Sequence, residues 1–291
     1  MNAPAVRPFV ASDLAAAARF CDRARLLDPA IEPFSRGLAA LASGSRARLD
    51  LWAVASEGSD EVCGIAFAVL REGGSASAPA WLDVYAAVSP PRRRHGIGRA
   101  LCGAMVAEPA VLRARVHEES PEGRAFLHAL GFQDRSVLLS MLWSSRPLEE
   151  RPSHAVRVRK ATKDDARTLE ALARDAWVDK PEAFTSRPED VRRFFVEGQV
   201  ALVAESGKRP VGYLTGASLG RALAIEEVAV LPRHRRSGIG RALLVEGMRG
   251  ASHAMLAVEE SNHAARALYR SLGFESSARR IVCERPWQVR G

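Results

Sequence analysis

The chain carries the stretch Val88-Ser-Pro-Pro-Arg-Arg-Arg-His-Gly-Ile-Gly-Arg-Ala-Leu101, which recurs as Val230-Leu-Pro-Arg-His-Arg-Arg-Ser-Gly-Ile-Gly-Arg-Ala-Leu243. The two copies are offset by 142 residues, since the first loop glycine is residue 96 in one copy and 238 in the other. At the same offset, Leu130-Gly131-Phe132 recurs as Leu272-Gly273-Phe274. Two matches in the same order and at one offset indicate that the sequence contains a duplication.

The duplication predicts two domains, which fits a length of 291 residues. Near the start of each half, the segment Val6–Asp13 resembles Val158–Asp165, since each begins with Val-Arg and ends with Asp. Between the halves, residues 144–153 are polar, contain two prolines and lack apolar periodicity, which is typical of a linker. We therefore expect an N-terminal domain over 1–145, a linker over 146–154 and a C-terminal domain over 155–291.

Hydrophobic periodicity predicts the same order of elements in both halves. In the second half we expect helices over 162–177, 187–197, 238–248 and 262–272, and strands over 200–204, 211–217, 223–230, 254–258 and 281–284. In the first half, helices are expected over 12–27 and 32–42 and from residues 96 and 121, with strands over 51–55, 64–70, 82–88, 111–116 and 137–143. The predicted fold class is α+β, with a central sheet flanked by helices in each domain.

The composition is that of a globular protein with an excess of arginine. Hydrophobic residues make up 47% of the chain and charged residues 26%, and the net charge is +8. Only four of the 42 basic residues are lysine, and the arginine fork suits a polyphosphate ligand or nucleic acid. A general bias toward alanine and arginine is the alternative explanation of the charge.

The sequence also bears on compartment and metal binding. No segment approaches the roughly 20 apolar residues that span a bilayer, and the N-terminus lacks the apolar run of a signal peptide. The four cysteines are scattered, so we expect neither a disulfide framework nor a metal site. These features predict a cytoplasmic protein that does not act at membranes.

The repeated loop has the features of a phosphate cradle. In the second half a strand ending at Val230 leads through residues 232–240 into a helix, and Gly238 and Gly240 allow the backbone to approach an anion closely. The N–H groups of the helix's first turn, its dipole and the surrounding arginines all favour an anion there. The loop lacks the Gly-Lys-Ser/Thr of a P-loop and the three-glycine spacing of a dinucleotide fingerprint.

Both halves resemble the GCN5-related N-acetyltransferase (GNAT) superfamily over nearly the whole chain, most strongly in the second half. The resemblance is carried by Ala229-Val230-x-Pro232, Arg235-Arg236-Ser237-Gly238-Ile239-Gly240 and Asn262-x-x-Ala265-x-x-Leu268-Tyr269-x-x-Leu272-Gly273-Phe274. It implies two tandem domains with mixed, mostly antiparallel sheets, and acetyl-CoA as the cofactor. The pantetheine arm would lie between the strands that end at Val230 and Val258, and the pyrophosphate would lie in the loop 235–241.

The resemblance also implies which residues contact the cofactor. In the second half these are Val228, Ala229, Val230, Arg235, Arg236, Ser237, Gly238, Ile239, Gly240, Arg241 and Asn262. In the first half the matching positions are Val88, Arg93, Arg94, His95, Gly96, Ile97, Gly98 and Arg99.

Acetyl transfer to an amine needs a neutral nucleophile and a proton for the departing thiolate. Tyr269 lies seven residues after Asn262, so both project from one helix face, two turns apart. In the GNAT family a tyrosine at this position protonates the coenzyme A thiolate, and many members place a general base at the position of Glu227. Adjacent strand residues point to opposite faces, so only one of Glu226 and Glu227 can readily face the acceptor. The structural alternatives are a packing role for Tyr269 and a solvated carboxylate at Glu227.

The first half departs from the family pattern at the residues needed for chemistry. Its residues at the places of Tyr269, Asn262 and Glu227 are Leu127, Ser120 and Tyr85. Leucine cannot donate a proton, so we expect this domain to keep a cofactor-like cleft and to be catalytically degenerate. Tyr85 or His128 as a substitute proton donor is the alternative that stays open.

The sequence therefore predicts an N-acetyltransferase that moves an acetyl group from acetyl-CoA directly to a primary amine of a small molecule or peptide. The alternative is a non-catalytic protein that binds coenzyme A, or another polyphosphate, as a sensor. No recognition motif or stacking aromatic pattern supports binding to nucleic acid. The mixed charges of residues 177–197 do not identify the acceptor, and we expect either a monomer, as a pseudo-dimer of domains, or a homodimer.

Overall fold

The structure is a computed structural model, and it describes residues 5–27, 52–57, 61–71, 81–104, 111–144, 156–178, 195 and 198–286. The predicted helices over 32–42 and 187–197 and the linker over 146–154 lie outside these ranges, except for residue 195. The chain forms two compact units. Unit 1 comprises residues 1–71, 80–135 and 281–291, and unit 2 comprises residues 72–79 and 136–280.

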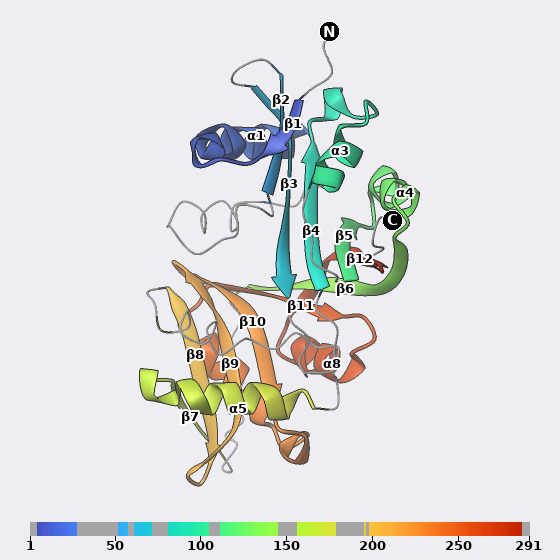
Figure 1. Ribbon diagram of the computed structural model, residues 1–291. Coiled ribbons are helices and arrows are strands. Elements are labelled where there is room, and N and C mark those ends of the chain that lie inside the picture. Colours follow the sequence, from blue (N-terminus) through green and yellow to red (C-terminus); the bar gives the residue numbers. More distant parts are fainter. Residues whose placement is uncertain are drawn as a thin grey trace. The chain divides into compact units, whose positions relative to one another are not determined.

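Unit 1 contains a mixed sheet with helices packed on it (Figure 1). Its strands are β1 (Ala5–Pro8), β2 (Trp52–Glu57), β3 (Glu61–Arg71), β4 (Trp81–Val88) and β5 (Val111–His117). Its helices are α1 (Leu14–Leu27), α3 (Ile97–Ala104) and α4 (Pro121–Ala129), with short 3-10 turns at Ala11–Asp13 and Pro90–Arg92. Strands β1 to β4 pair in antiparallel order, and β4 and β5 pair in parallel.

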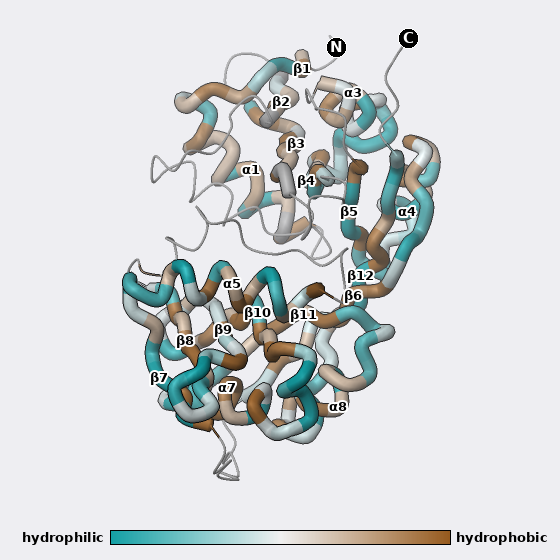
Figure 2. Tube along the Cα trace, turned by 60° about the horizontal axis from the view of Figure 1, so that its bottom comes forward, coloured by the Kyte–Doolittle hydropathy of each residue, from teal (hydrophilic) through white to brown (hydrophobic). Residues whose placement is uncertain are grey.

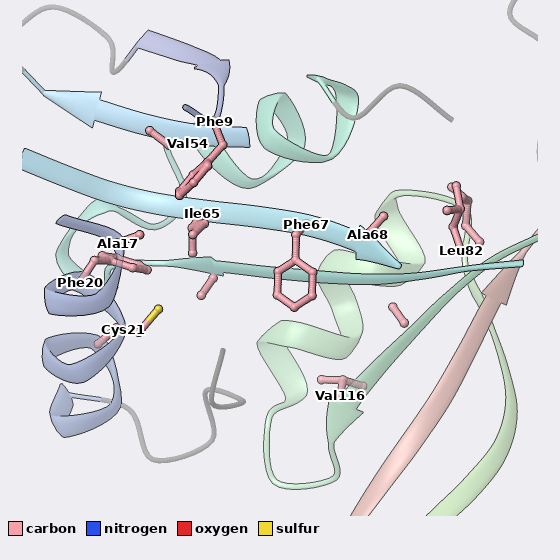
Figure 3. Packing of buried hydrophobic residues seen from close by; sticks show 14 of the residues in the cluster. Phe9, Ala17, Phe20, Cys21, Val54, Ile65, Phe67, Ala68, Leu82 and Val116 are labelled. Carbon is pink, nitrogen blue, oxygen red and sulfur yellow. The ribbon is translucent and has the colours of Figure 1, made fainter. Parts of the chain in front are cut away.

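Apolar side chains of α1 and the sheet form the core of unit 1. Phe20 and Cys21 of α1 are buried in one cluster with Ile65 and Phe67 of β3, as Figure 3 shows. Helix α3 packs closely against the sheet at Gly64, where an added Cβ would lie 3.0 Å from Leu101 Cδ1. Burial of these side chains is the main favourable contribution to folding of the unit.

Unit 2 repeats this order of elements. Its strands are β7 (Arg157–Lys160), β8 (Gln199–Ser206), β9 (Arg209–Leu219), β10 (Ala222–Val230) and β11 (His253–Glu259), and its helices are α5 (Ala166–Ala176), α7 (Ile239–Gly247) and α8 (His263–Ser271). Short 3-10 turns at Lys163–Asp165 and Pro232–His234 precede α5 and α7. Strands β7 to β10 pair in antiparallel order, and β10 and β11 pair in parallel. The predicted mixed, mostly antiparallel sheet flanked by helices is therefore confirmed.

The two faces of the unit 2 sheet carry different helices. Apolar residues of α5, such as Leu172, are buried with Tyr213 and Ala229 on one face. An added Cβ on Gly212, the neighbour of Tyr213, would lie 3.4 Å from side-chain atoms of α7, so α7 covers the opposite face. Helix α5 alternates hydrophilic and hydrophobic residues along its length, as an amphipathic helix that covers a sheet requires (Figure 2).

The last sheet position in each unit is filled by a strand from the other half of the sequence. Strand β6 (Gln133–Ser144) follows α4 in the chain but pairs with β11, in antiparallel register from Leu138↔Glu259 to Ser144↔His253. Strand β12 (Glu275–Arg285) ends in unit 1, where it neighbours β5. The strand order is β1-β2-β3-β4-β5-β12 in unit 1 and β7-β8-β9-β10-β11-β6 in unit 2. Sequence periodicity predicted both strands but not this exchange.

Strand β12 is also longer than its predicted span of 281–284. Its first six residues, Glu275–Arg280, are mostly polar and partly or fully exposed, so hydrophobicity does not reveal them. They belong to unit 2, where Ser277 Oγ donates a hydrogen bond of 3.3 Å to the Ser140 carbonyl. The apolar residues Ile281 and Cys283 are buried in the core of unit 1. Residues 275–280 of β12 therefore belong to unit 2, and residues 281–285 belong to unit 1.

Candidate functional site

The glycine loops of the two units have the same backbone conformation. Arg236 and Gly238 have φ of 63° and 83°, and Arg94 and Gly96 have φ of 70° and 79°. No atom lies within 4 Å of an added Cβ at Gly238, so this position favours glycine because of its φ and not for lack of space. Residues with positive φ turn successive N–H groups toward one side of the loop. Gly238 is also the N-cap of α7, so the free N–H groups of the first helical turn follow directly after it. The loop therefore presents backbone donors suited to an anion.

The second glycine of each loop has a packing role. An added Cβ at Gly240 would lie 3.3 Å from Leu268 Cδ2 of α8. At Gly98 the corresponding contact is Phe126 Cζ of α4, at 3.0 Å. The second glycine thus lets the two helices of each pair approach each other, and its predicted close approach to an anion stays a prediction.

The arginines of the second loop differ in their surroundings. Arg235 donates from Nε to the Val230 carbonyl at 3.2 Å and from Nη2 to the Ala176 carbonyl at 2.8 Å, so it joins the loop to the end of α5. Arg241 Nη1 donates to Ser271 Oγ at 3.1 Å and joins α7 to α8. Arg236 is exposed and makes no hydrogen bond or ion pair with the described part of the chain. Of these three cations, Arg236 is the one best placed to meet an external anion.

The remaining residues of the second loop shape it. Ser237 Oγ donates a hydrogen bond of 2.6 Å to the His234 carbonyl, which closes the turn ahead of Gly238. Ile239 is buried and anchors the start of α7 in the core of unit 2. The first loop is held in the same way, because Arg93 Nε donates to the Val88 carbonyl at 3.2 Å. Its exposed residue Arg94 matches Arg236.

A β-bulge marks the centre of β10. The pairing with β9 runs Ile225↔Gly216 and then Glu227↔Thr215, so Glu226 is an extra residue. Pairing of β10 with β11 ends at Ala224↔Met255, just before the bulge. The two parallel strands therefore stop exchanging hydrogen bonds on the stretch that contains Val228 and Val230 and leads to the loop.

The bulge determines which of the two carboxylates faces α5. Leu223 and Ile225 are buried with α7 on the other face, so strict alternation would turn Glu226 toward α5. Because Glu226 is the extra residue, Glu227 takes this direction instead. Tyr213, in the core cluster of α5, donates a hydrogen bond of 2.9 Å from its hydroxyl to Glu227 Oε2.

A tryptophan extends this contact. Trp177, the C-cap residue of α5, donates from Nε1 to the Tyr213 hydroxyl at 3.3 Å. The sequence prediction included Glu227 but missed Tyr213, which lies on β9 and is fully buried. The sequence signal that could have found it is its residue type, because it is one of three tyrosines in the chain and the one aromatic residue of β9.

Helix α8 carries the predicted acid. Tyr269 is half-buried, packs against the core of unit 2 and lies with its ring centroid 5.8 Å from that of Phe274. Burial raises the pKa of Tyr269 to about 12, which keeps its hydroxyl protonated at neutral pH. Asn262 caps the same helix, since its side-chain oxygen accepts a hydrogen bond of 3.2 Å from the Ala265 N–H. Asn262 thus has a structural role in addition to the predicted contact with the cofactor.

The corresponding place in unit 1 is built differently. Strand β4 pairs with β3 without a bulge and with β5 as far as Val84↔Ala114, one pair further than in unit 2. Tyr85 stacks on Phe67 with ring centroids 4.6 Å apart, and its hydroxyl accepts a hydrogen bond of 3.1 Å from Arg115 Nη1. Arg115 also pairs with buried Asp83 at 3.3 Å. Leu127 contributes an apolar contact to the core where unit 2 has Tyr269.

Comparison with known proteins identifies the family. Residues 169–274 match the model of the acetyltransferase (GNAT) family. A mycothiol acetyltransferase of Thermobifida fusca is 31% identical over 267 residues, which cover 79% of this chain and 80% of that protein. The chain belongs to the GNAT family.

Solved structures show the same fold along this GNAT chain. A GCN5-related N-acetyltransferase from Sphaerobacter thermophilus superimposes with a TM-score of 0.71 at 21% identity, covering 97% of this chain and 95% of that one. A tandem GNAT protein from the clavulanic acid biosynthesis pathway superimposes with a TM-score of 0.72 at 19% identity, covering 97% and 98%. The two tandem GNAT folds expected from the duplication are thereby confirmed.

Family membership makes the chain an acetyl-CoA-dependent N-acetyltransferase. The residues present fit this cofactor: the α7 N-terminus and Arg236 suit its pyrophosphate, and the stretch of β10 that no longer pairs with β11 has backbone groups suited to its amide-containing arm. The described residues include no group of three or more His, Cys, Asp or Glu placed to hold a metal ion. No helix among them has both the length and the apolar character needed to cross a bilayer.

Proposed function

We propose that unit 2 transfers the acetyl group of acetyl-CoA directly to a primary amine of a small molecule, with Glu227 as general base and Tyr269 as general acid. The observation that carries the proposal is the bulge in β10. It ends the pairing with β11 ahead of the glycine loop and turns a hydrogen-bonded carboxylate toward α5. An opening for the cofactor arm and a candidate base are thus provided by one strand.

In this proposal each residue has a distinct role. Glu227 takes a proton from the acceptor ammonium, directly or through a water, so that the nitrogen lone pair can attack the thioester carbonyl. Tyr269 donates its proton to the departing thiolate sulfur as the C–S bond breaks and the C–N bond forms. The loop 235–241 binds the pyrophosphate, and Val228, Ala229 and Val230 offer backbone groups to the cofactor arm.

We also propose that the N-terminal sequence half is catalytically degenerate and keeps a cofactor-like loop at residues 93–99. Tyr85 stands in the place of Glu227 and is already bonded to Arg115, and Leu127 offers no proton. His128, the other candidate donor, contacts Asp134 at 2.8 Å, on the side of α4 that faces β6. These contacts support the proposal that neither candidate donor takes the place of Tyr269.

The acceptor is tested with a panel of primary amines in the presence of acetyl-CoA, with detection of both free thiol and acetylated product. Because several curated relatives are mycothiol acetyltransferases, their acceptor is the first member of the panel. We expect thiol release that depends on the amine. Binding of acetyl-CoA without transfer to any amine in the panel would favour the sensor class over this proposal.

Tyr269→Phe tests the acid. The variant keeps the ring and its contact with Phe274, and we expect kcat to fall about 100-fold while the Kd for acetyl-CoA stays within twofold. Leu127→Met, at the repeat position in unit 1, is the matched control and should leave turnover unchanged. A wild-type rate for Tyr269→Phe would remove the tyrosine from the mechanism.

A further inference from the structure

We infer that Tyr213 is a positioning residue for acetyl transfer, which holds the carboxylate of Glu227 and favours its ionised form through a hydrogen bond. The inference rests on the proposed function, in which Glu227 is the general base. It adds to that function a residue on a neighbouring strand, and a third, Trp177, that acts through Tyr213.

The contact is geometrically well defined. Tyr213 is only 1% exposed, and its hydroxyl lies 2.9 Å from Glu227 Oε2. In the register of β9 and β10, Tyr213 is opposite Ala229 and Thr215 is opposite Glu227, so the hydrogen bond runs diagonally between strands on one face. Apolar residues of α5, including Leu172 and Ala176, belong to the same cluster as the ring of Tyr213. The hydroxyl is therefore held in place by packing that does not involve Glu227.

The hydrogen bonds have a direction. An indole N–H can only donate, so Trp177 Nε1 donates to the Tyr213 oxygen, and the tyrosine proton is then available to the carboxylate. Burial and the charge of Glu227 hold the pKa of Tyr213 well above its ordinary value, so the phenol stays protonated. Serial donation from Trp177 to Tyr213 to Glu227 polarises the phenol and strengthens its bond to the carboxylate.

The hydrogen bond from Tyr213 favours the ionised form of the Glu227 carboxyl. A donor that bonds to an ionised carboxylate stabilises the charged form and opposes the rise in pKa that partial burial would cause. A base must be ionised at working pH to accept a proton. Tyr213 thus allows Glu227 to be half-buried beside α5 and still act as a base at neutral pH.

Tyr213→Phe tests the inference, because it removes the hydroxyl and leaves the packed ring. We expect the acid limb of the pH profile of kcat/KM to move upward by about one pH unit, the size expected for loss of one hydrogen bond to a charged group. The Kd for acetyl-CoA should not change. An acid limb at its wild-type position would overturn the inference.

Thr215→Val is the matched control for disturbance of the strand pair. Thr215 is fully buried directly opposite Glu227, and its hydroxyl has no hydrogen-bond partner within the described ranges. The variant changes the same neighbourhood without touching the bond to Glu227, so the acid limb should stay in place. An equal shift in Thr215→Val would show that repacking and not the Tyr213 hydroxyl sets the pH profile, and would also overturn the inference.

Glu227→Gln separates this inference from the proposed function. If Glu227 is the base, the glutamine variant loses most activity together with the acid limb, and the result for Tyr213→Phe then decides on the positioning role. If Glu227→Gln has the wild-type rate and profile, both proposals fail. If Tyr213→Phe does not fold, Trp177→Phe takes its place, because it removes the donor to the Tyr213 hydroxyl. It should move the acid limb of the kcat/KM profile upward by a smaller amount. An unmoved acid limb would contradict the positioning role of Tyr213.

Discussion

Units 1 and 2 share the conformation of their glycine loops but differ in the strand that leads to each loop. Both loops combine an arginine and a glycine at positive φ, and both tie the first arginine to the carbonyl at the end of the preceding strand. Of β4 and β10, only β10 has a bulge in its antiparallel pairing, and it stops pairing with β11 sooner than β4 does with β5. The same loop conformation therefore occurs after a strand that has the arrangement proposed for catalysis and after one that does not.

The difference also extends to the charged groups beside the strands. In unit 2 the carboxylate of Glu227 meets a neutral donor, Tyr213. In unit 1 the residue at the position of Glu227 is Tyr85, which accepts from Arg115, and Arg115 also pairs with buried Asp83. Tyr85, Arg115 and Asp83 of unit 1 therefore satisfy one another, as buried polar groups in a core usually do. In unit 2 the proposed base is instead held by a neutral donor on the face of the sheet that α5 covers.

The largest effect is expected from a pair of adjacent carboxylates. Glu227→Gln should lower kcat/KM by about 100-fold or more, because glutamine cannot accept the acceptor's proton. Glu226→Gln, at the exposed extra residue of the bulge, should change it less than twofold. Steady-state kinetics at several pH values distinguishes them, and equal losses in the two variants would show that the bulge does not select one carboxylate.

The strand exchange predicts an effect on stability across the sequence halves. Met141 of β6 belongs to the first half of the sequence but is fully buried in the core of unit 2. Met141→Ala should lower the free energy of unfolding by about 2–4 kcal/mol, as for other truncations in protein cores. Hydrogen exchange should become faster in β11 and α7, while α1 and β3 keep their protection. Faster exchange in unit 1 alone would contradict the exchange of strands.

The two loops can be compared through their left-handed glycines. Gly238→Ala and Gly96→Ala each place a Cβ at positive φ, which costs about 1–2 kcal/mol, and neither meets a neighbouring atom. We expect similar losses in Tm, but only Gly238→Ala should raise the KM for acetyl-CoA, by about tenfold through distortion of the donor N–H groups. If Gly96→Ala raises the KM for acetyl-CoA equally, the loop of unit 1 also contributes to the site at which acetyl-CoA is turned over.

The smallest expected effect concerns a feature that both units share. Asp13 accepts two hydrogen bonds of 2.7 Å from Arg7, and Asp165 accepts two of 2.8 Å from Arg159, which lowers the pKa of each carboxyl below its usual value. Their contribution to stability is therefore complete above the unfolded-state pKa of about 4 and is lost as the pH falls below it.

Thermal unfolding between pH 6 and pH 3 measures this contribution. Tm should fall toward pH 3. The pKa of Asp165 is lowered further by its additional hydrogen bond from Thr162, so this residue contributes more of the pH dependence. The slope of Tm against pH should therefore be shallower in Asp165→Asn than in Asp13→Asn. Both pairs are partly exposed to solvent, so each effect should be a few degrees at most and should decrease with added salt. Wild-type slopes in both variants would mean that the pairs do not stabilise the fold.

Much of the fold could be predicted from local sequence. The repeat located both loops, and strand periodicity placed β8, β9 and β10 within one or two residues of their observed bounds. The polar start of β12 was missed because exposed strand residues carry no hydrophobic signal. Its partner and that of β6 could not be predicted, because both copies of the repeat encode similar strands and sequence alone does not tell which sheet each one joins.

The sequence by itself determined the duplication, the position of the two glycine loops, the family resemblance and the asymmetry between Tyr269 and Leu127, because these depend on residue type and on spacing along the chain. Tertiary structure decided which carboxylate faces α5, because a bulge interrupts the alternation that a reader of the sequence would extend. It also decided that Tyr213, 14 residues before Glu227 in the chain, donates to it. Such pairs depend on strand register, which long-range packing sets and local sequence does not.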